Sequence, residues 1–294
     1  MDSEANETRT IDTGTAGPTG TIGTGPAVDT TGTGPAVNAT GTGPAVDTTE
    51  SGPAADRTED LRHLRQLVAR ARHVVFDFDG PVCFLFPGSS AERVARDRAE
   101  WLREHGLHGL LMEEDRGHPD PYLVLSAVAG RHPGSDLVAE LEERLTRQEL
   151  AEVPRAWPTP YADVLVRTWT ALGARLAIAT DTSDRPVLSY LDSRGLTGCF
   201  APHVYGRTPV PDLRLPGPHP HAVRRALNAL GAAAGTSLVI GDTPADFAAA
   251  REAGTAFVGY APNERGERRL LEAGVPRRHL VSSLDVLLRA VREG

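Results

Sequence analysis

The chain has 294 residues and a formal net charge of −8 at pH 7. Apolar residues make up 40% and charged residues 24% of it, which is ordinary for a globular protein of about two domains. Residues 1–56 hold eight acidic side chains and one arginine, so the rest of the chain is close to neutral. A neutral body lacks the basic stripe that binds a phosphate backbone, and we expect no nucleic-acid partner.

All 31 basic residues are arginine, which excludes mechanisms that need an ammonium side chain, such as a pyridoxal Schiff base. The two cysteines, Cys83 and Cys199, form no C-x-x-C pair, so we expect no disulfide framework and a reducing compartment. The acidic N-terminus has no signal-peptide pattern, and no stretch of about 18 apolar residues is present. The sequence therefore predicts a cytoplasmic protein with no membrane partner.

Residues 1–56 differ in composition from the rest of the chain. They contain no aromatic residue and repeat a nine-residue unit, GTGPAVDTT, GTGPAVNAT and GTGPAVDTT, over residues 23–49. So little apolar surface cannot offset the entropy lost on ordering, and we expect a disordered acidic tail.

From residue 57 onward, the pattern is that of an α/β protein. A helix is expected at 58–72, and short apolar runs indicate strands at 73–78, 174–180, 203–205, 236–240 and 256–260. Helical patterns lie between them at 161–172, 186–194, 220–230 and 245–253. This alternation predicts a doubly wound parallel sheet with helices on both faces, built from residues 57–88 and 156–294.

The segment 89–155 interrupts this alternation, because it has helical patterns and no strand. Helices are expected at 91–105, 121–129 and 137–150, broken by Gly- and Pro-containing stretches. We interpret the segment as an inserted α-helical cap domain over the carboxyl ends of the strands, where ligands bind in such folds.

Carboxylates and a hydroxyl follow three of the predicted strands. Asp77 and Asp79 end the first strand, with Gly80 allowing a sharp turn, and Thr180 ends the second. Asp242 lies at the tip of another strand in the sequence GDTPAD, and Asp246 lies one turn into the next helix. Helix capping by one of this last pair, with the other exposed to solvent, is the alternative.

Carboxylates packed this closely repel one another unless a cation lies among them. Asp77, Asp79, Asp242 and Asp246 offer hard oxygen ligands, and no cluster of His or Cys accompanies them. The sequence therefore predicts Mg²⁺ as the cofactor.

The motifs DFDG, IAT and GDTPAD, in this order and with a helical segment after the first, resemble those of the haloacid dehalogenase superfamily. The resemblance covers residues 73–262 and is to the phosphatase branch with a helical cap, phosphoglycolate phosphatases included. It implies a Rossmann-like core and Mg²⁺-dependent hydrolysis of a small phosphorylated metabolite. It also implies that Asp77 is the nucleophile that becomes an aspartyl-phosphate, and that Asp79 is the general acid and base. Gly80, Thr180 and Asp181 would bind the phosphoryl group, and Asp242 and Asp246 would hold the metal.

One motif departs from the family pattern, which supplies a lysine before Pro-x-Pro. The equivalent stretch is LPGPHP, with Gly217 at the lysine position. Arg214 or Arg207 is close enough in sequence to replace the missing cation, since a guanidinium binds phosphate well. The alternatives are a phosphomutase with the same core, or a homologue with impaired catalysis that binds only. The oligomeric state is left open.

Three arginines on the first helix of the insertion, Arg93, Arg96 and Arg98, have two interpretations. We expect a solvated helix face, because charged side chains are rarely buried. The alternative is contact with an anionic substrate.

Overall fold

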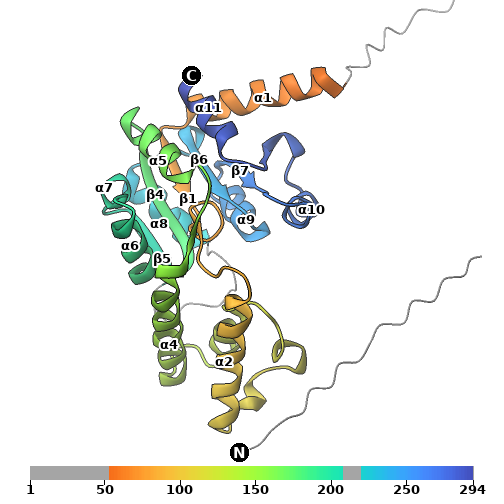
Figure 1. Ribbon diagram of the computed structural model, residues 1–294, viewed down its shortest axis with the longest axis vertical. Helices are drawn as coiled ribbons and strands as arrows, with labels where there is room; N and C mark the ends of the chain where they lie inside the picture. Colours follow the sequence, from red (N-terminus) through yellow and green to blue (C-terminus); the bar gives the residue numbers. More distant parts are fainter. Residues whose placement is uncertain (1–52, 208–219, 294) are drawn as a thin grey trace, which may run out of the picture. The chain divides into compact units, whose positions relative to one another are not determined.

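The computed structural model describes residues 53–207 and 220–293. Its main sheet has six strands, all parallel, and the two central strands, β1 and β6, pair in register from His73 with Ser237 to Phe76 with Ile240 (Figure 1). In order across the sheet, the strands are β5 (Val204–Arg207), β4 (Arg175–Ser183), β1 (His73–Phe76), β6 (Ser237–Gly241), β7 (Ala256–Tyr260) and β8 (Leu280–Val281).

Helices cover both faces of the sheet, which confirms the predicted doubly wound α/β fold. One face packs against α1 (Pro53–Arg70), α5 (Ala162–Ala171), α6 (Asp184–Ser193) and α11 (Asp285–Glu293). The other packs against α8 (Pro220–Leu230), α9 (Pro244–Glu252) and α10 (Glu264–Glu272). Apolar side chains alternate along β1 between the two resulting cores, with Val74 and Phe76 in one and Val75 in the other. The short helix α7 (Thr197–Phe200) precedes β5.

All five strands expected from the sequence are present, whereas β8 and the short strands β2 (Cys83–Phe84) and β3 (Trp157–Pro158) were not expected. The strand β4 runs to Ser183, three residues beyond the predicted end, and therefore includes Thr180 and Asp181. Helix α1 begins at Pro53, five residues earlier than predicted.

The segment expected to be helical contains α2 (Ser90–Glu104), α3 (Leu123–Arg131) and α4 (Asp136–Glu152), close to the predicted bounds. The 3-10 turns η1 (His108–Leu110), η2 (Glu113–Asp115) and η3 (Val153–Arg155) accompany them. The three helices share a hydrophobic cluster that is separate from the two cores of the sheet. A small antiparallel sheet of β2 (Cys83–Phe84) and β3 (Trp157–Pro158) joins the two chain connections that enter and leave this segment. We refer to residues 89–155 as the helical insertion, and its status as a cap domain stays a prediction.

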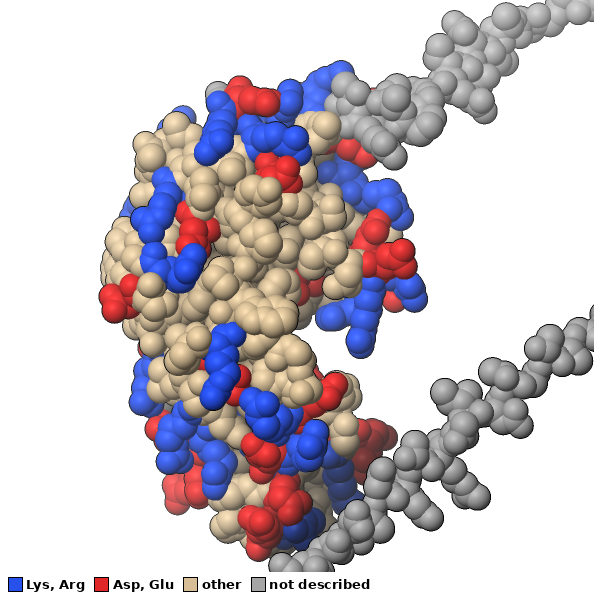
Figure 2. Space-filling view, in the orientation of Figure 1, with Lys and Arg blue, Asp and Glu red and all other residues tan. Residues whose placement is uncertain are grey.

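The predicted disordered tail, residues 1–56, lies outside the described residues except for the first turn of α1. On the face of the molecule seen in Figure 2, arginine and acidic side chains are intermingled. Within the described part of the chain, no helix is long and apolar enough to cross a membrane.

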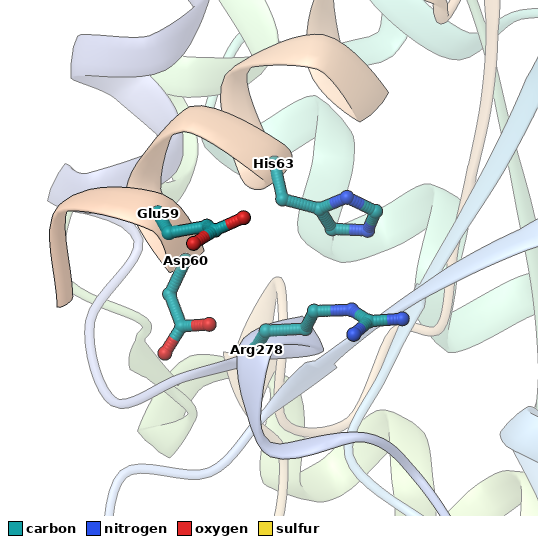
Figure 3. Close-up of a pocket in the computed structure, with 4 residues that line it drawn as sticks. All are labelled: Glu59, Asp60, His63 and Arg278. Atoms are coloured by element: carbon teal, nitrogen blue, oxygen red, sulfur yellow. The ribbon is translucent and has the colours of Figure 1, made fainter. Parts of the chain in front are cut away.

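A pocket lies between α1 and the 3-10 turn η5 (Arg277–His279) that precedes β8. Glu59, Asp60 and His63 of the helix and Arg278 of the turn line it (Figure 3). Beside it, the His63 and His279 rings stack with centroids 5.0 Å apart, and their Nε2 atoms are 2.9 Å apart. The elements that form this pocket precede β1 and β8, so it lies away from the carboxyl ends of the strands.

We expect the contribution of the His63–His279 contact to the stability of the fold to be lost in acid. Burial, followed by the charges of His63 and Arg278, lowers the pKa of His279 to about 4, below the 6.5 of an unfolded chain. A group whose pKa is lowered by folding contributes stability above its unfolded pKa, and this contribution is lost as the pH falls from 6.5 toward 4. Because the ring is only half-buried, the loss should be on the order of 1 kcal/mol. Melting temperatures of wild type and His279→Gln, measured from pH 8 to 4.5, should converge as the pH falls. A constant difference between the two would contradict this assignment.

Candidate active site

The first carboxylates of the site lie directly after β1. The Asp77 amide still donates to the Ile240 carbonyl at 2.8 Å, so the strand pairing with β6 holds this residue in place. Asp77 is 8% exposed, and its Oδ1 accepts a hydrogen bond from the Phe78 amide at 2.7 Å. Phe78 is fully buried in the core and contacts the Tyr190 ring edge-on. The alternation of side chains along an extended chain therefore places Asp77 and Asp79 on the side opposite Phe78.

A tight turn after Asp79 brings the chain up against the loop between β6 and α9. Gly80 has φ +111°, which favours glycine, and a Cβ at this position would lie 2.6 Å from the Asp242 Cγ. The Gly80 carbonyl accepts the Thr159 hydroxyl at 2.5 Å, and the Asp79 Oδ1 accepts the Leu85 amide at 2.9 Å. Glycine at position 80 is thus needed for both the turn and the approach to Asp242.

The second loop, between β6 and α9, positions Asp242 and Asp246. Thr243 is the N-cap of α9, and it forms a capping box with Asp246. The Asp246 Oδ2 accepts hydrogen bonds from the Thr243 amide at 3.0 Å, the Thr243 hydroxyl at 2.7 Å and the Asp242 amide at 3.2 Å. Capping is therefore the role of Thr243 with Asp246, while the buried Asp242 Oδ1 has no hydrogen-bond partner among the described residues.

Three carboxylates meet at this point. One oxygen each of Asp77, Asp242 and Asp246 lies within 4.8 Å of the other two. Burial, followed by the negative charges of Asp246 and Asp242, raises the pKa of Asp77 well above its ordinary value. Burial and the charge of Asp246 do the same for the pKa of Asp242, and burial raises the pKa of Asp246 to about 6.

This cluster fits a hard divalent cation. The three carboxylates repel one another, and the Asp242 Oδ1 is a buried acceptor without a donor. A bound cation would remove both costs, and oxygen ligands of this kind suit Mg²⁺. Asp79, also predicted as a ligand, is not one of the three. Burial raises its pKa to about 6, although the Leu85 amide opposes the shift.

The third strand end, that of β4, provides Thr180 and Asp181. Thr180 is 3% exposed, and its side chain lies near enough to Asp77 to offset part of the rise in the pKa of that carboxyl. Burial, followed by the charge of Asp246, raises the pKa of Asp181 to about 7. The sheet topology therefore brings together Asp77, Asp79, Gly80, Thr180, Asp181, Asp242 and Asp246. Arg214 and Gly217 lie outside the described residues.

Arg207, the other arginine considered as a replacement for the missing lysine, has different partners. It ends β5, and its Nε, Nη1 and Nη2 all donate to carboxylates of α4: Nε to Glu142 at 2.7 Å, Nη1 and Nη2 to Glu149 at 2.9 and 3.0 Å. The side chains of all three residues are at most 7% exposed. Although burial opposes it, the two carboxylates raise the pKa of Arg207. The donors of Arg207 are thus already occupied, and the residue links the sheet to the helical insertion.

Two other contacts join the helical insertion to the end of β4. The Glu149 Oε2 accepts the Ser183 amide at 3.2 Å, and the Tyr122 and Thr182 hydroxyl oxygens are 3.0 Å apart. The Arg207 guanidinium lies over the Tyr122 ring, 5.6 Å from its centroid. Sequence patterns give no sign of these residues as partners, because Tyr122 and Glu149 read as ordinary helix-segment residues far from β4 in the sequence.

The arginines of α2 do not share one environment. Arg96 is exposed, as expected for a solvated face, and Arg93 pairs with Glu152 at 2.6 Å. Arg98 is fully buried, so the expectation of a solvated face is wrong for this residue. Its Nη1 donates to the Gln148 Oε1 at 3.1 Å, but its Nε and Nη2 have no partner among the described residues. An unmet buried donor costs about 1–3 kcal/mol, so this arrangement is unfavourable as it stands.

Comparisons with known proteins agree with the fold and the family that the motifs resemble. The sequence model of the haloacid dehalogenase-like hydrolase family matches residues 71–254. The phosphoglycolate phosphatase of Rhodospirillum rubrum is 30% identical over 196 residues, which cover 63% of this chain and 77% of that protein.

Two solved structures have the same fold. One, from Clostridium acetobutylicum and described as a predicted phosphatase, has a TM-score of 0.55 at 18% identity and covers 76% of this chain and 98% of its own. The other, a haloacid dehalogenase-like family protein from Streptococcus pneumoniae, has a TM-score of 0.53 at 20% identity, with coverages of 75% and 99%.

The fold and the strand-end carboxylates define a hydrolase with a Rossmann-like core. The chain belongs to the haloacid dehalogenase-like hydrolase family. The predicted family and the predicted enzyme class, a phosphatase, are confirmed.

We expect Arg207 to be needed for stability. Arg207→Met leaves Glu142 and Glu149 buried without their counter-charge, which costs about 3–5 kcal/mol in such pairs. Arg185→Met is a matched control, because it breaks an exposed pair with Glu143 on the same helix and should cost at most about 1 kcal/mol. Urea unfolding of the two variants measures the difference in the free energy of unfolding. Equal losses would show that the buried ion pairs do not stabilise the fold.

Proposed function

We propose that this enzyme hydrolyses a small phosphate monoester through an aspartyl-phosphate on Asp77, with Mg²⁺ as its cofactor. The observation that carries the proposal is the meeting of Asp77, Asp242 and Asp246 at adjoining strand ends, with the Thr180 side chain beside Asp77. Asp79 follows two residues after Asp77, on the same side of the chain. These positions match the nucleophile, acid–base and metal positions of the family resemblance.

In the first step, a carboxylate oxygen of Asp77 attacks the phosphorus, and the bond from phosphorus to the ester oxygen breaks. Asp79 in its protonated form donates its proton to that leaving oxygen, which departs as an alcohol. In the second step, Asp79 as carboxylate accepts a proton from water while the water oxygen attacks the phosphorus. Inorganic phosphate leaves, and Asp77 regains its carboxylate.

The surrounding residues position and neutralise the phosphoryl group. The Thr180 hydroxyl and the turn at Gly80 lie beside Asp77 and would bind the phosphoryl oxygens, with Asp181 next to Thr180. Mg²⁺, held by Asp77, Asp242 and Asp246, would offset the negative charge of the phosphoryl group and the carboxylates. Asp79 was also predicted as a metal ligand. Because it is not one of the three clustered carboxylates, we propose that it acts mainly as the general acid and base.

The positive charge that the family places in its third motif has to come from elsewhere in this chain. We propose Arg214, three residues before Gly217, because Arg207 already donates to two carboxylates. A phosphomutase of the same family, or a homologue that binds without turnover, is distinguished from this proposal by the experiments below.

We propose a small phosphorylated metabolite as the substrate, because the helical insertion contacts the end of β4 directly and would restrict access to the neighbouring strand ends. The cytoplasmic location predicted from the sequence stays part of this proposal. The similarity to a phosphoglycolate phosphatase makes 2-phosphoglycolate the first compound to assay.

Phosphate release should depend on both Mg²⁺ and Asp77. We expect Asp77→Asn to lower the rate about 1,000-fold or more, since the attacking carboxylate is removed. EDTA should abolish wild-type release, and added Mg²⁺ should restore it. Without metal, the variant should melt at the same temperature as wild type or higher, because one of three repelling carboxylates is gone.

Asp192→Asn, a change at an exposed position of α6, serves as the matched control and should leave the rate unchanged. Full activity of Asp77→Asn would remove Asp77 as nucleophile. Retention of a phosphoenzyme by the wild type, together with a need for a bisphosphate, would identify a mutase instead.

Arg214 should be needed for turnover. We expect Arg214→Ala to lower kcat/KM about 100-fold, because a guanidinium that binds phosphate contributes about 1.5–3 kcal/mol. Gly217→Lys in the Arg214→Ala background should recover part of the rate by restoring the family cation. The assay is release of phosphate from a common aryl phosphate. An unchanged rate in Arg214→Ala would show that Arg214 does not replace the family lysine. If the wild type releases no phosphate and Gly217→Lys does, the chain is a homologue with impaired catalysis.

A further inference from the structure

Arg98 is a buried cation with an unused pair of donors. Its side chain is fully buried on α2, and one nitrogen, Nη1, donates to Gln148. The other two nitrogens, Nε and Nη2, are buried and have no hydrogen-bond partner among the described residues. These two nitrogens form one edge of the guanidinium, and their N–H bonds point in parallel, as required to bind both oxygens of a carboxylate.

No acidic side chain of the described residues lies within ion-pair distance of Arg98, in contrast with its buried neighbour. Arg207 donates to both Glu142 and Glu149. Burial, followed by the positive charge of Arg207, lowers the pKa of Arg98 to about 10, whereas the charge of Glu149 only partly opposes the shift. A guanidinium buried in this way lacks both a counter-charge and acceptors for two of its nitrogens, and a bound anion would provide both.

Arg98 lies near the contacts between the helical insertion and the end of β4. Its partner Gln148 is adjacent in sequence to Glu149, which binds the Ser183 amide at the end of β4. The charge of Asp120 acts on Arg98, and Tyr122 contacts Thr182, two residues after Thr180. The unused edge of Arg98 therefore belongs to the region where the helical insertion meets the predicted phosphoryl-binding strand end.

We propose that Arg98 determines specificity by binding a carboxylate that the substrate carries in addition to its phosphoryl group. The inference rests on the proposed function and makes it narrower: the substrate is a small phosphate monoester of a hydroxy acid. The fork of Arg98 matches a planar carboxylate, which it would hold through two parallel hydrogen bonds. Since Arg98 is fully buried, the substrate reaches it when the helical insertion moves away from the strand ends, and its binding favours closure.

The test compares substrates that differ only in this group. Two matched pairs are 2-phosphoglycolate with 2-hydroxyethyl phosphate, and 3-phosphoglycerate with glycerol 3-phosphate, in which CH₂OH replaces the carboxylate. We expect wild type to prefer the carboxylate member of at least one pair. Arg98→Met should lower kcat/KM for that member by roughly 100-fold and for its neutral partner by less than about 3-fold. Arg98→Lys, which keeps the charge and loses the fork, should lie between wild type and Arg98→Met.

Arg93→Met is the matched control, because Arg93 lies on the same helix and already pairs with Glu152. It should leave the preference unchanged. Equal loss on both members of a pair in Arg98→Met would assign Arg98 a structural role and overturn the proposal. The absence of any wild-type preference in either pair would overturn it as well.

A binding measurement separates this proposal from the proposed function. If wild type hydrolyses none of the four compounds or an aryl phosphate, the proposed function fails. Calorimetric titration with 2-phosphoglycolate and 2-hydroxyethyl phosphate then tests Arg98 alone. Tighter binding of the carboxylate that disappears in Arg98→Met supports the subsite, and equal binding of the two compounds overturns it.

Discussion

The carboxylates at the ends of β1 and β6 are the constraint on which the rest of the site depends. Asp77, Asp242 and Asp246 are held within 4.8 Å of one another, where burial and mutual repulsion disfavour their ionised forms. The backbone is built to allow this approach: Gly80 leaves room for Asp242, and the capping box at the start of α9 fixes Asp246. The close approach of these carboxylates therefore lowers the stability of the fold. A bound cation would offset their charge and could also offset that of a phosphoryl group.

A second concentration of charge, of mixed sign, connects this site to the helical insertion. Arg207 at the end of β5 is enclosed by Glu142 and Glu149 of α4, and Glu149 also binds the Ser183 amide of β4. The desolvation of such a network offsets much of its net gain, but removal of one partner is strongly unfavourable because it leaves a buried charge unpaired. The network therefore holds α4 to the strand ends in one arrangement. Because the network contacts Asp181 and Ser183, the position of the insertion and the shape of the proposed phosphoryl site are linked.

The parts of this structure that follow short-range rules could be predicted from the sequence. Alternation in HVVFDF placed Asp77 and Asp79 after a buried strand, and all five expected strands are present because each is a short apolar run bounded by turns. The parallel topology then accounts for the meeting of distant strand ends. The roles of Arg98 and Arg207 could not be predicted, because their partners Gln148 and Glu142 are 50 and 65 residues away in sequence. An arginine on an amphipathic helix has the same local pattern whether it faces solvent or the interior of a closed interface.

Because the chain has no lysine, each of its buried side-chain cations is a guanidinium, whose fixed donor directions indicate where acceptors are expected. An ammonium group can rotate to meet whatever acceptors are near, whereas a guanidinium presents donors in fixed directions, so an unmet edge shows where an acceptor is missing. Arg207 and Arg98 are buried close enough for each to affect the other, but only Arg207 has its nitrogens matched by carboxylates. If Arg98 served packing alone, a neutral side chain of similar volume would avoid the cost of burying its charge. A buried guanidinium with an unmet edge near the proposed phosphoryl-binding strand end therefore fits the proposed recognition of a group that arrives with the substrate.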